Sequence, residues 1–270
     1  QEGFCMMCIM EAHVNQVLYS SGSTIRPTAV SSVLTVRIEQ HFRPDRQEDA
    51  HEFLHCTVDA MQTACLSRSS NLDISSQETT IIHQIFEGFL RSRVTCLSCR
   101  AVSNSYEALL NVPLDIKAAS SVTTALEDSV KPEQLSGENA YKCGKCDKMV
   151  AAFKRFTVHR SPRVLTACLK RFEGFTGRKI STVVECPEYL DLQPYVSQTA
   201  GEPLLYTLYA VLLHSGVSSR AGHYFCYTKY PYLSMQASNG LWYKMNDESV
   251  DACGFNTVLG QQAYLLFYVR

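Results

Sequence analysis

The chain lacks the features that mark membrane proteins and proteins built to bind nucleic acids. No stretch of its 270 residues approaches the roughly 18 uninterrupted apolar residues of a membrane span. The apolar start, Phe4 to Met10, lacks the basic leader and small-residue cleavage site of a signal peptide. An excess of one charge is also missing, because 25 Lys and Arg stand against 26 Asp and Glu. We therefore expect a soluble intracellular protein, nuclear, cytoplasmic or both, with no membrane and no nucleic acid as partner.

The chain does have a core-forming composition and many cysteines. Hydrophobic residues make up 46% of it, and its length allows one large domain or two smaller ones. Of the twelve cysteines, four form two Cys-x-x-Cys pairs and the others are scattered on apolar segments. This usage is typical of reduced thiols plus one metal site, and a disulfide-stapled secreted protein is the alternative.

The first part of the chain is predicted to be helical. Apolar residues from Phe53 to Cys65 recur at intervals of three and four after an acidic start at Asp45 to Asp49, which predicts an amphipathic helix. Two further helices are predicted over Met6 to Leu18 and Ser31 to Phe42. The polar run from Ser67 to Thr80 is expected to be a connecting loop.

Strands dominate the rest of the chain. They are predicted from Ile85 to Thr95, Ala151 to Thr157, Val164 to Phe172, Leu205 to His214, His223 to Lys229, Trp242 to Met245 and Ala263 to Val269. Ser121 to Val130 is a predicted short helix between them. Helices followed by strands indicate an α+β protein with segregated layers.

The two Cys-x-x-Cys pairs predict a metal site. Thiolates at this spacing on tight turns can reach one tetrahedral zinc ion, and 43 residues separate Cys99 from Cys143. With Cys96, Cys99, Cys143 and Cys146 filling all four positions, no coordination site remains for water, so the zinc is expected to be structural. The alternative is four incidental thiols.

A second cluster has the residue types of nucleophilic catalysis. His223 follows Gly222, a small residue that permits close approach of a substrate, and Asn246 lies on the next predicted strand. Across an antiparallel pair, the Asn246 side chain would hold the His223 ring with one nitrogen toward a nucleophile. A lone strand histidine is more often a surface or core residue, so this signal is weak by itself.

The acidic turn from Gln47 to Phe53 has two interpretations. Carboxylates in the first turn of a helix are expected from capping and from the helix dipole alone. The three acids, Glu48, Asp49 and Glu52, with His51 would also bind a basic peptide.

Together these motifs resemble the ubiquitin-specific protease family of cysteine deubiquitinases, across nearly the whole chain. Gln47 to Phe53 is similar to the family's Gln-Gln/Glu-Asp-Ala-x-Glu-Phe box, and Leu169 to Phe172 to its Leu-Lys-Arg-Phe strand. The cysteine pairs match the family's fingers. Its histidine box resembles Tyr209 to Gly216 and Ala221 to Tyr224, and its closing strands resemble Trp242 to Asp247 and Ala263 to Tyr268.

The resemblance implies a papain-like fold of thumb, fingers and palm, with zinc in the fingers. It would form one N-terminally incomplete domain over residues 1–270 without the thumb's first helix, divided into a thumb at 1–84, fingers at 85–163 and a palm at 164–270. The chain is expected to act as a monomer on ubiquitin and ubiquitinated proteins, with no organic cofactor.

The resemblance also implies roles for single residues. His223 would be the general base, Asn246 would orient it, and Asp247 would be a further polar support near the oxyanion. Contacts to ubiquitin are expected from Asp49 and Glu52, which would meet the arginines of the ubiquitin tail, and from Gly222 and Tyr224.

The chain departs from the family in two places. It contains no Gly-x-x-Asn-x-Gly-Asn-Thr-Cys box to supply the nucleophile, and the nearby Cys5 and Cys8 lack the neighbours that would form an oxyanion hole. Tyr230 to Gln236 lengthens the hairpin between His223 and Asn246, and a shifted register there would turn Asn246 to the opposite face.

These observations leave three functions open. The first is a deubiquitinase that hydrolyses isopeptide bonds at the C-terminal glycine of ubiquitin, with this chain inactive by itself because it lacks the nucleophile. The second is a non-catalytic ubiquitin-binding module. The third, a zinc-ribbon adaptor for nucleic acid, is disfavoured by the near-neutral charge.

Overall fold

Two of the three helices predicted at the start of the chain are confirmed, and the third matches only in part. The computed structural model describes residues 5–20, 24–33, 42, 47–66, 80–173, 177–198, 201–218, 221–229 and 241–270. The predicted first helix is α1 (Met6–Tyr19), and the amphipathic helix after the acidic turn is α3 (Ala50–Leu66). The helix predicted from Ser31 begins earlier, as α2 (Thr28–Val33), and residues 34–41 of that prediction lie outside the described residues. No helix of the described part is long and apolar enough to cross a membrane.

One strand prediction is wrong at its start. Ile85 and Phe86 end a short helix, α5 (Ile81–Phe86), because the Thr80 hydroxyl caps it by accepting from the His83 N–H. The strand begins at Gly88, where an added Cβ would lie 2.3 Å from the Arg160 carbonyl oxygen. The rest of the predicted loop before Thr80, residues 67–79, lies outside the described residues.

The larger sheet has eight strands, and most were predicted. Its order is β13-β12-β11-β10-β14-β8-β3, with β9 paired to β10. The bounds are β3 (Val112–Leu114), β8 (Val164–Leu169), β9 (Tyr189–Asp191), β10 (Leu205–Ser218), β11 (Ala221–Lys229), β12 (Trp242–Asn246), β13 (Ser249–Cys253) and β14 (Ala263–Val269). The predictions did not include β13, which follows β12 after a tight turn at Asp247.

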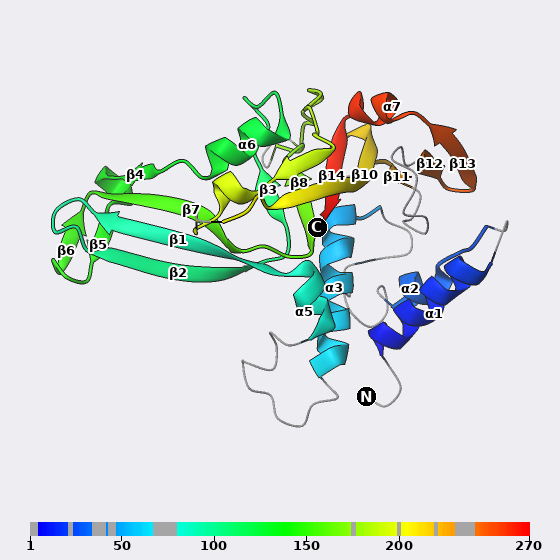
Figure 1. Cartoon of the computed structure of the whole chain (residues 1–270), viewed down its shortest axis with the longest axis horizontal. Helices are drawn as coiled ribbons and strands as arrows, with labels where there is room; N and C mark the ends of the chain where they lie inside the picture. Colours follow the sequence, from blue (N-terminus) through cyan, green and yellow to red (C-terminus); the bar gives the residue numbers. More distant parts are fainter. Residues whose placement is uncertain are drawn as a thin grey trace.

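A four-stranded sheet extends from the larger sheet as a long arm, at the left of Figure 1. Its order is β2-β1-β7-β4, with bounds β1 (Gly88–Cys96), β2 (Val102–Leu109), β4 (Glu133–Leu135) and β7 (Ala152–Arg160). The hairpin of β5 (Tyr141–Cys143) and β6 (Lys148–Val150) lies at its tip. Alternating side chains on β1 and β7 therefore give this arm two distinct faces.

The range 85–163, expected to form the fingers, contributes strands to both sheets. Its middle part leaves the arm, since β3 pairs in parallel with β8 of the larger sheet. The predicted helix at Ser121 to Val130 is confirmed as α6 (Val122–Ser129), and its buried side chains Val122 and Leu126 belong to the core of the larger sheet. Burial of these apolar side chains thus places the segment against the larger sheet, whereas the strands before and after it in the sequence belong to the arm.

Two main clusters of apolar side chains stabilise the molecule. The larger one covers one face of the eight-stranded sheet, and Tyr206, Leu208, Leu266 and Tyr268 are fully buried there. The second joins the helices through Met6 of α1, Val30 of α2, Val58 of α3 and Ile82 of α5, which gather below the sheets in Figure 1. The last helix, α7 (Phe255–Leu259), contributes Val258 to the larger cluster.

A buried arginine fixes the end of β8. Arg171 is 1% exposed and donates to the carbonyl oxygens of Ala263, Ile180 and Thr182, the last two at 2.9 and 2.7 Å. Burial lowers the pKa of its guanidinium to about 10, which leaves it charged at neutral pH. The side chain therefore links β8 and β14 to the loop that follows β8.

Replacing this arginine should weaken the fold. We expect Arg171→Met to lower the free energy of unfolding by about 2–4 kcal/mol, because three buried carbonyl groups lose a charged donor. Urea denaturation followed by fluorescence measures this change. The exposed Arg163 provides a matched control, and Arg163→Met should stay within about 0.5 kcal/mol of the parent. Equal effects of the two substitutions would contradict the assignment.

Candidate active site

The site begins at the junction of α3 with the larger sheet. Asp49 caps α3 by accepting from the backbone N–H groups of His51 and Glu52 at 2.8 and 3.2 Å. The same carboxylate accepts from the hydroxyl of Tyr264, on β14, at 2.7 and 3.0 Å. Burial first, and then the Asp49 charge, raise the pKa of Tyr264 above its usual range. One carboxylate thus starts the helix and holds it against the sheet.

An aromatic cluster lies beside this junction. The ring of His214, on β10, is 4.8 Å from that of Tyr224 and 5.3 Å from that of Phe172, and Phe172 lies 5.6 Å from Tyr264. Burial lowers the pKa of His214, with the Lys179 ammonium as a second cause. His214 is therefore a neutral packing residue on the strand next to His223.

Gly222 has a packing role in addition to the role predicted for it. An added Cβ at this position would lie 2.1 Å from His214 Nε2 and 2.7 Å from the Ser215 carbonyl oxygen. The missing side chain therefore makes room for the buried His214 ring. Tyr224 likewise packs inward, and burial followed by the Asp49 charge raises its pKa to about 12.

His223 and Asn246 are brought together. The His223 Nε2 atom lies 2.5 Å from Asn246 Oδ1. Because an amide oxygen can only accept, Nε2 carries the proton in this pair, and Nδ1 is left as the basic nitrogen. The His223 ring also stacks on Phe225, with ring centres 6.4 Å apart. The alternative in which Asn246 turns to the opposite face is not observed, and residues 230–240 lie outside the described residues.

Asp247 lies at the edge of this pair. Its Oδ2 is 3.7 Å from His223 Nε2, and 77% of its side chain is exposed. Its backbone has φ of 50°, in the left-handed region that the turn between β12 and β13 requires. The turn places the carboxylate near the imidazole without a short hydrogen bond.

One contact that the sequence motifs did not predict connects α3 to the histidine strand. The side-chain oxygen Oε1 of Gln47 accepts from the backbone N–H of Gly222 at 2.7 Å. Gln47 was part of the acidic motif but had no role there. Only the fold brings residues 175 positions apart within reach, so no local signal could have shown this pairing.

No thiol accompanies the imidazole. All twelve cysteines lie in the described part of the chain, and none forms a hydrogen bond with His223 there. Burial raises the pKa of Cys168 to about 12 and also raises that of Cys226. Cys5 and Cys8 lie at the start of α1, with their sulfur atoms 2.9 Å apart. The thiols nearest to the sheet core are therefore protonated packing groups.

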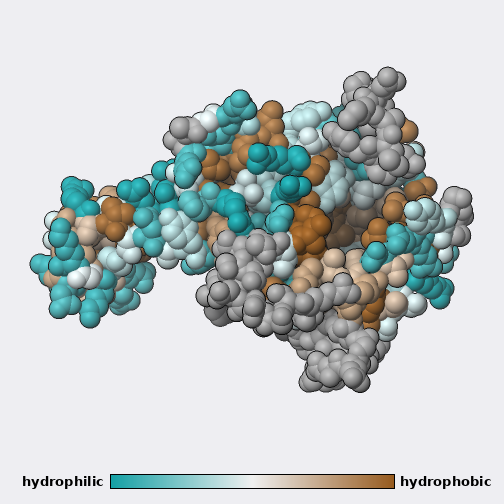
Figure 2. Space-filling view, turned by 60° about the horizontal axis from the view of Figure 1, so that its bottom comes forward, coloured by the Kyte–Doolittle hydropathy of each residue, from teal (hydrophilic) through white to brown (hydrophobic). Residues whose placement is uncertain are grey.

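An apolar cavity separates α3 from the sheet. It has a volume of about 330 Å³ and is lined by Ala50, Phe53, Leu54, Thr57, Ala210, Val211, Leu212, Cys226, Leu265 and Phe267. In Figure 2, hydrophobic residues gather around the hollow in the middle of the molecule, whereas the extended arm is mostly hydrophilic. The cleft beside α3 is thus bordered by apolar side chains.

The four predicted metal ligands form one cluster at the tip of the arm. The sulfur atoms of Cys96, Cys99, Cys143 and Cys146 all lie within 4.8 Å of one another. Each pair is followed by a residue with positive φ, Arg100 at 62° and Asp147 at 51°, which closes a tight turn. The backbone N–H of Cys99 lowers the pKa of Cys96 to about 6, which favours its thiolate. Four sulfur donors at this spacing can hold a tetrahedral metal ion.

The sequence is similar to one family of known proteins over nearly its whole length. The profile of the family described as "Ubiquitin carboxyl-terminal hydrolase" matches residues 2–268. The human "Ubiquitin carboxyl-terminal hydrolase 42" is 58% identical over 269 residues, which cover 100% of this chain and 20% of that protein. The human "Ubiquitin carboxyl-terminal hydrolase 17" is 48% identical over 266 residues, with 98% of this chain and 48% of that protein covered. The chain thus spans about a fifth to a half of the length of these relatives.

Solved structures show the same fold. The SAGA DUB module of Ubp8, Sgf11, Sus1 and Sgf73 bound to monoubiquitin contains a chain that matches with a TM-score of 0.82 and 30% identity, over 98% of this chain and 58% of that one. A structure of the same yeast module with an altered Sgf73 matches with a TM-score of 0.79 and 31% identity, over 98% of this chain and 57% of that one.

The packing of Gly222 under His214 can be tested by adding one methyl group. We expect Gly222→Ala to lower the free energy of unfolding by about 1–3 kcal/mol, because the buried ring and a backbone oxygen would both have to move. Gly201→Ala is the matched control, since an added Cβ there meets no atom within 4 Å. Thermal unfolding of both variants measures the difference. Equal free energies of unfolding of the two variants would show that the His214 ring moves aside at no cost, which would contradict this packing role.

Proposed function

The chain belongs to the ubiquitin carboxyl-terminal hydrolase family, as its motifs predict, and we propose that the protein is a cysteine-type deubiquitinase. Its reaction would be hydrolysis of isopeptide bonds at the C-terminal glycine of ubiquitin on protein conjugates. The observation that carries this proposal is the 2.5 Å hydrogen bond between His223 Nε2 and Asn246 Oδ1. It holds an imidazole in the tautomer that a general base needs.

In the proposed mechanism, His223 moves protons through its Nδ1 atom. As base, Nδ1 takes the proton of a cysteine thiol, and as acid it returns this proton to the departing lysine amine. Asn246 keeps the ring oriented through Nε2. Asp247, with its carboxylate 3.7 Å from Nε2, would be a further polar support near the oxyanion.

The nucleophile is the part of this mechanism that the chain does not supply. None of its twelve thiols forms a hydrogen bond with His223 in the described structure. Without a thiolate, no acyl-enzyme can form, and water activated directly by His223 would lose most of the rate advantage of the covalent route. The chain of 270 residues is therefore expected to be inactive by itself.

Ubiquitin recognition is proposed at the start of α3 and along β11. Glu52 is exposed on the first turn, where it can meet the arginines of the ubiquitin tail by charge-assisted hydrogen bonds. Asp49 would act mainly by holding α3 in place, because its carboxylate already binds two backbone N–H groups and Tyr264. Gly222 and Tyr224 would border the tail from the β11 side.

The four-cysteine cluster is proposed to bind one structural zinc ion. Cys96, Cys99, Cys143 and Cys146 would fill all four positions, which leaves none for a reacting water. The metal would join the β1–β2 turn to the β5–β6 hairpin and neutralise the thiolates. No catalytic step depends on it.

A second candidate is a non-catalytic ubiquitin-binding module. The surfaces proposed above for ubiquitin would serve this module equally, because they could hold ubiquitin without cleaving it. The two candidates share the ubiquitin contacts and differ in whether the protein has a nucleophile.

A thiol-reactive ubiquitin tests whether the chain itself binds ubiquitin and whether it carries a working nucleophile. Ubiquitin with an electrophile at its C-terminus should bind the chain but form no covalent adduct, and a ubiquitin–fluorophore substrate should show no turnover. Mass spectrometry detects adducts, and fluorescence measures turnover. An adduct at Cys5 or Cys8, with turnover abolished by His223→Ala, would contradict the expected inactivity. Absence of ubiquitin binding would remove both candidate functions for this chain.

Zinc binding can be measured directly. Native mass spectrometry should detect one zinc ion per chain, and Cys143→Ser should lose it because a three-thiolate site holds the ion much more weakly. Cys253→Ser is the matched control, since Cys253 lies in the larger sheet away from the cluster, and it should retain the ion. Chelation should lower the unfolding temperature of the parent. Equal zinc content in both variants would argue against the assigned ligands.

A further inference from the structure

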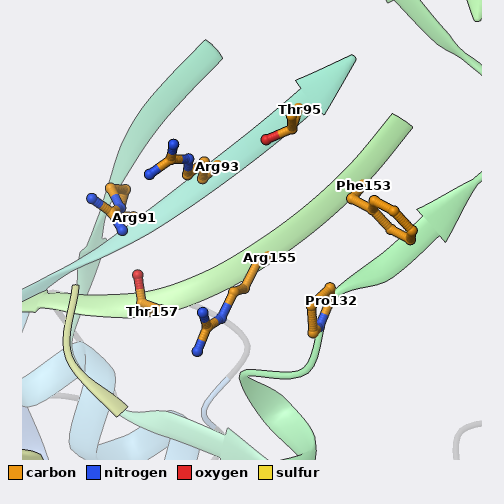
Figure 3. Close-up of a pocket in the computed structure, with 7 residues that line it drawn as sticks. All are labelled: Arg91, Arg93, Thr95, Pro132, Phe153, Arg155 and Thr157. Carbon is orange, nitrogen blue, oxygen red and sulfur yellow. The ribbon is translucent and has the colours of Figure 1, made fainter. Parts of the chain in front are cut away.

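A basic pocket lies on the arm formed by the four-stranded sheet, apart from α3 and His223. It has a volume of about 550 Å³ and is lined by Arg91, Arg93, Thr95, Pro132, Phe153, Arg155 and Thr157. Figure 3 shows these side chains around the pocket, most of them on β1 and β7. The register pairs Arg91 with Thr157 and Arg93 with Arg155, so the four side chains start from the same face of the sheet.

The positive charges of this pocket have no negative partners among the residues that the structure describes. Arg91, Arg93 and Arg155 form no ion pair with any carboxylate of the described residues. The contact of Arg155 is with a neutral group, because its Nε donates to the Val130 carbonyl oxygen at 2.9 Å. Three guanidinium groups on neighbouring positions of two strands repel one another unless an anion lies between them.

Two buried polar atoms of the pocket also lack partners. Arg91 Nε and the Thr157 hydroxyl are both buried, and neither has a hydrogen-bond partner in the described structure. The Thr157 side chain belongs to a residue that is only 3% exposed. Buried hydrogen-bond donors are nearly always paired. Arg91 and Thr157 are cross-strand neighbours that line one pocket, so their two unpaired donors indicate a missing acceptor there.

We infer that this pocket binds a phosphoryl group, either as free phosphate or on a peptide. Phosphate oxygens can accept from several donors at once, and the planar guanidinium forks of Arg91 and Arg93 match this geometry. The Thr157 hydroxyl supplies a further donor at the bottom of the pocket. The Phe153 ring and Pro132 form an apolar wall that suits the carbon chain carrying a peptide-borne phosphoryl group.

The inference is tested by binding measurements on the whole chain with two probes. One is inorganic phosphate, compared with chloride at equal ionic strength, and the other is a capped pentapeptide of alanines around one phosphoserine, compared with its unphosphorylated form. Calorimetric titration should give binding that weakens at least about tenfold in Arg93→Gln and Thr157→Val, since each removes one donor. The matched control, Arg163→Gln, removes an exposed arginine charge outside the pocket and should bind like the parent.

Thermal unfolding gives a second readout that a purely structural role would not produce. Thr157→Val should raise the unfolding temperature without phosphate, because it removes an unpaired buried hydroxyl, and should reduce the additional rise that phosphate causes in the parent. Binding of both probes would assign the site to free phosphate as well as peptides, and binding of the phosphopeptide alone would assign it to peptides. The inference is overturned if neither probe binds the parent up to about 10 mM, or if the pocket variants bind as tightly as the parent.

Discussion

The hydrogen bond between Asp49 and Tyr264 is the interaction on which the candidate site depends. The Asp49 carboxylate begins α3 through two backbone N–H groups and receives the Tyr264 hydroxyl from β14. Most apolar side chains of α3 and of the sheet belong to different clusters, and Leu54 of α3 packs against the small cluster of Cys168, Tyr264 and Leu265, so the polar contact adds to apolar packing at this border. Because the contact is partly buried and charge-assisted, it is stronger than an exposed hydrogen bond between neutral groups.

The rest of the site is built outward from this junction. Tyr264 and Phe172 support the His214 ring and Tyr224, and the His214 ring fills the space that Gly222 leaves open. The N–H of Gly222 then donates to the side chain of Gln47, and this hydrogen bond connects the histidine strand to the start of α3. His223 is therefore positioned by its neighbours on β11, and Asn246 only needs to orient its ring. The metal cluster and the basic pocket lie on the separate arm.

Much of the fold could be predicted from local patterns, and the site could be predicted only in part. The periodicity around Phe53 gave α3, and apolar alternation gave β8, β10 and β14, because burial of one face determines both signals. The metal cluster was also predictable, since Cys-x-x-Cys spacing describes a local turn. Local patterns could not reveal the contacts of Asp49 with Tyr264 or of Gln47 with Gly222, because these join residues that only the tertiary fold brings together. The same limit applies to the packing of Gly222 under His214 and to the pairing of β3 with β8, which also join distant residues.

A double-mutant cycle between Asp49 and Tyr264 tests the central claim most directly. The free energies of unfolding of Asp49→Ala, Tyr264→Phe and the double variant would be compared with that of the parent. The cap that Asp49 provides is lost equally with and without the Tyr264 hydroxyl, so it cancels in the cycle. The account predicts a coupling energy of about 1–3 kcal/mol between the two positions. Additivity within about 0.3–0.5 kcal/mol would show that this contact does not hold α3 to the sheet.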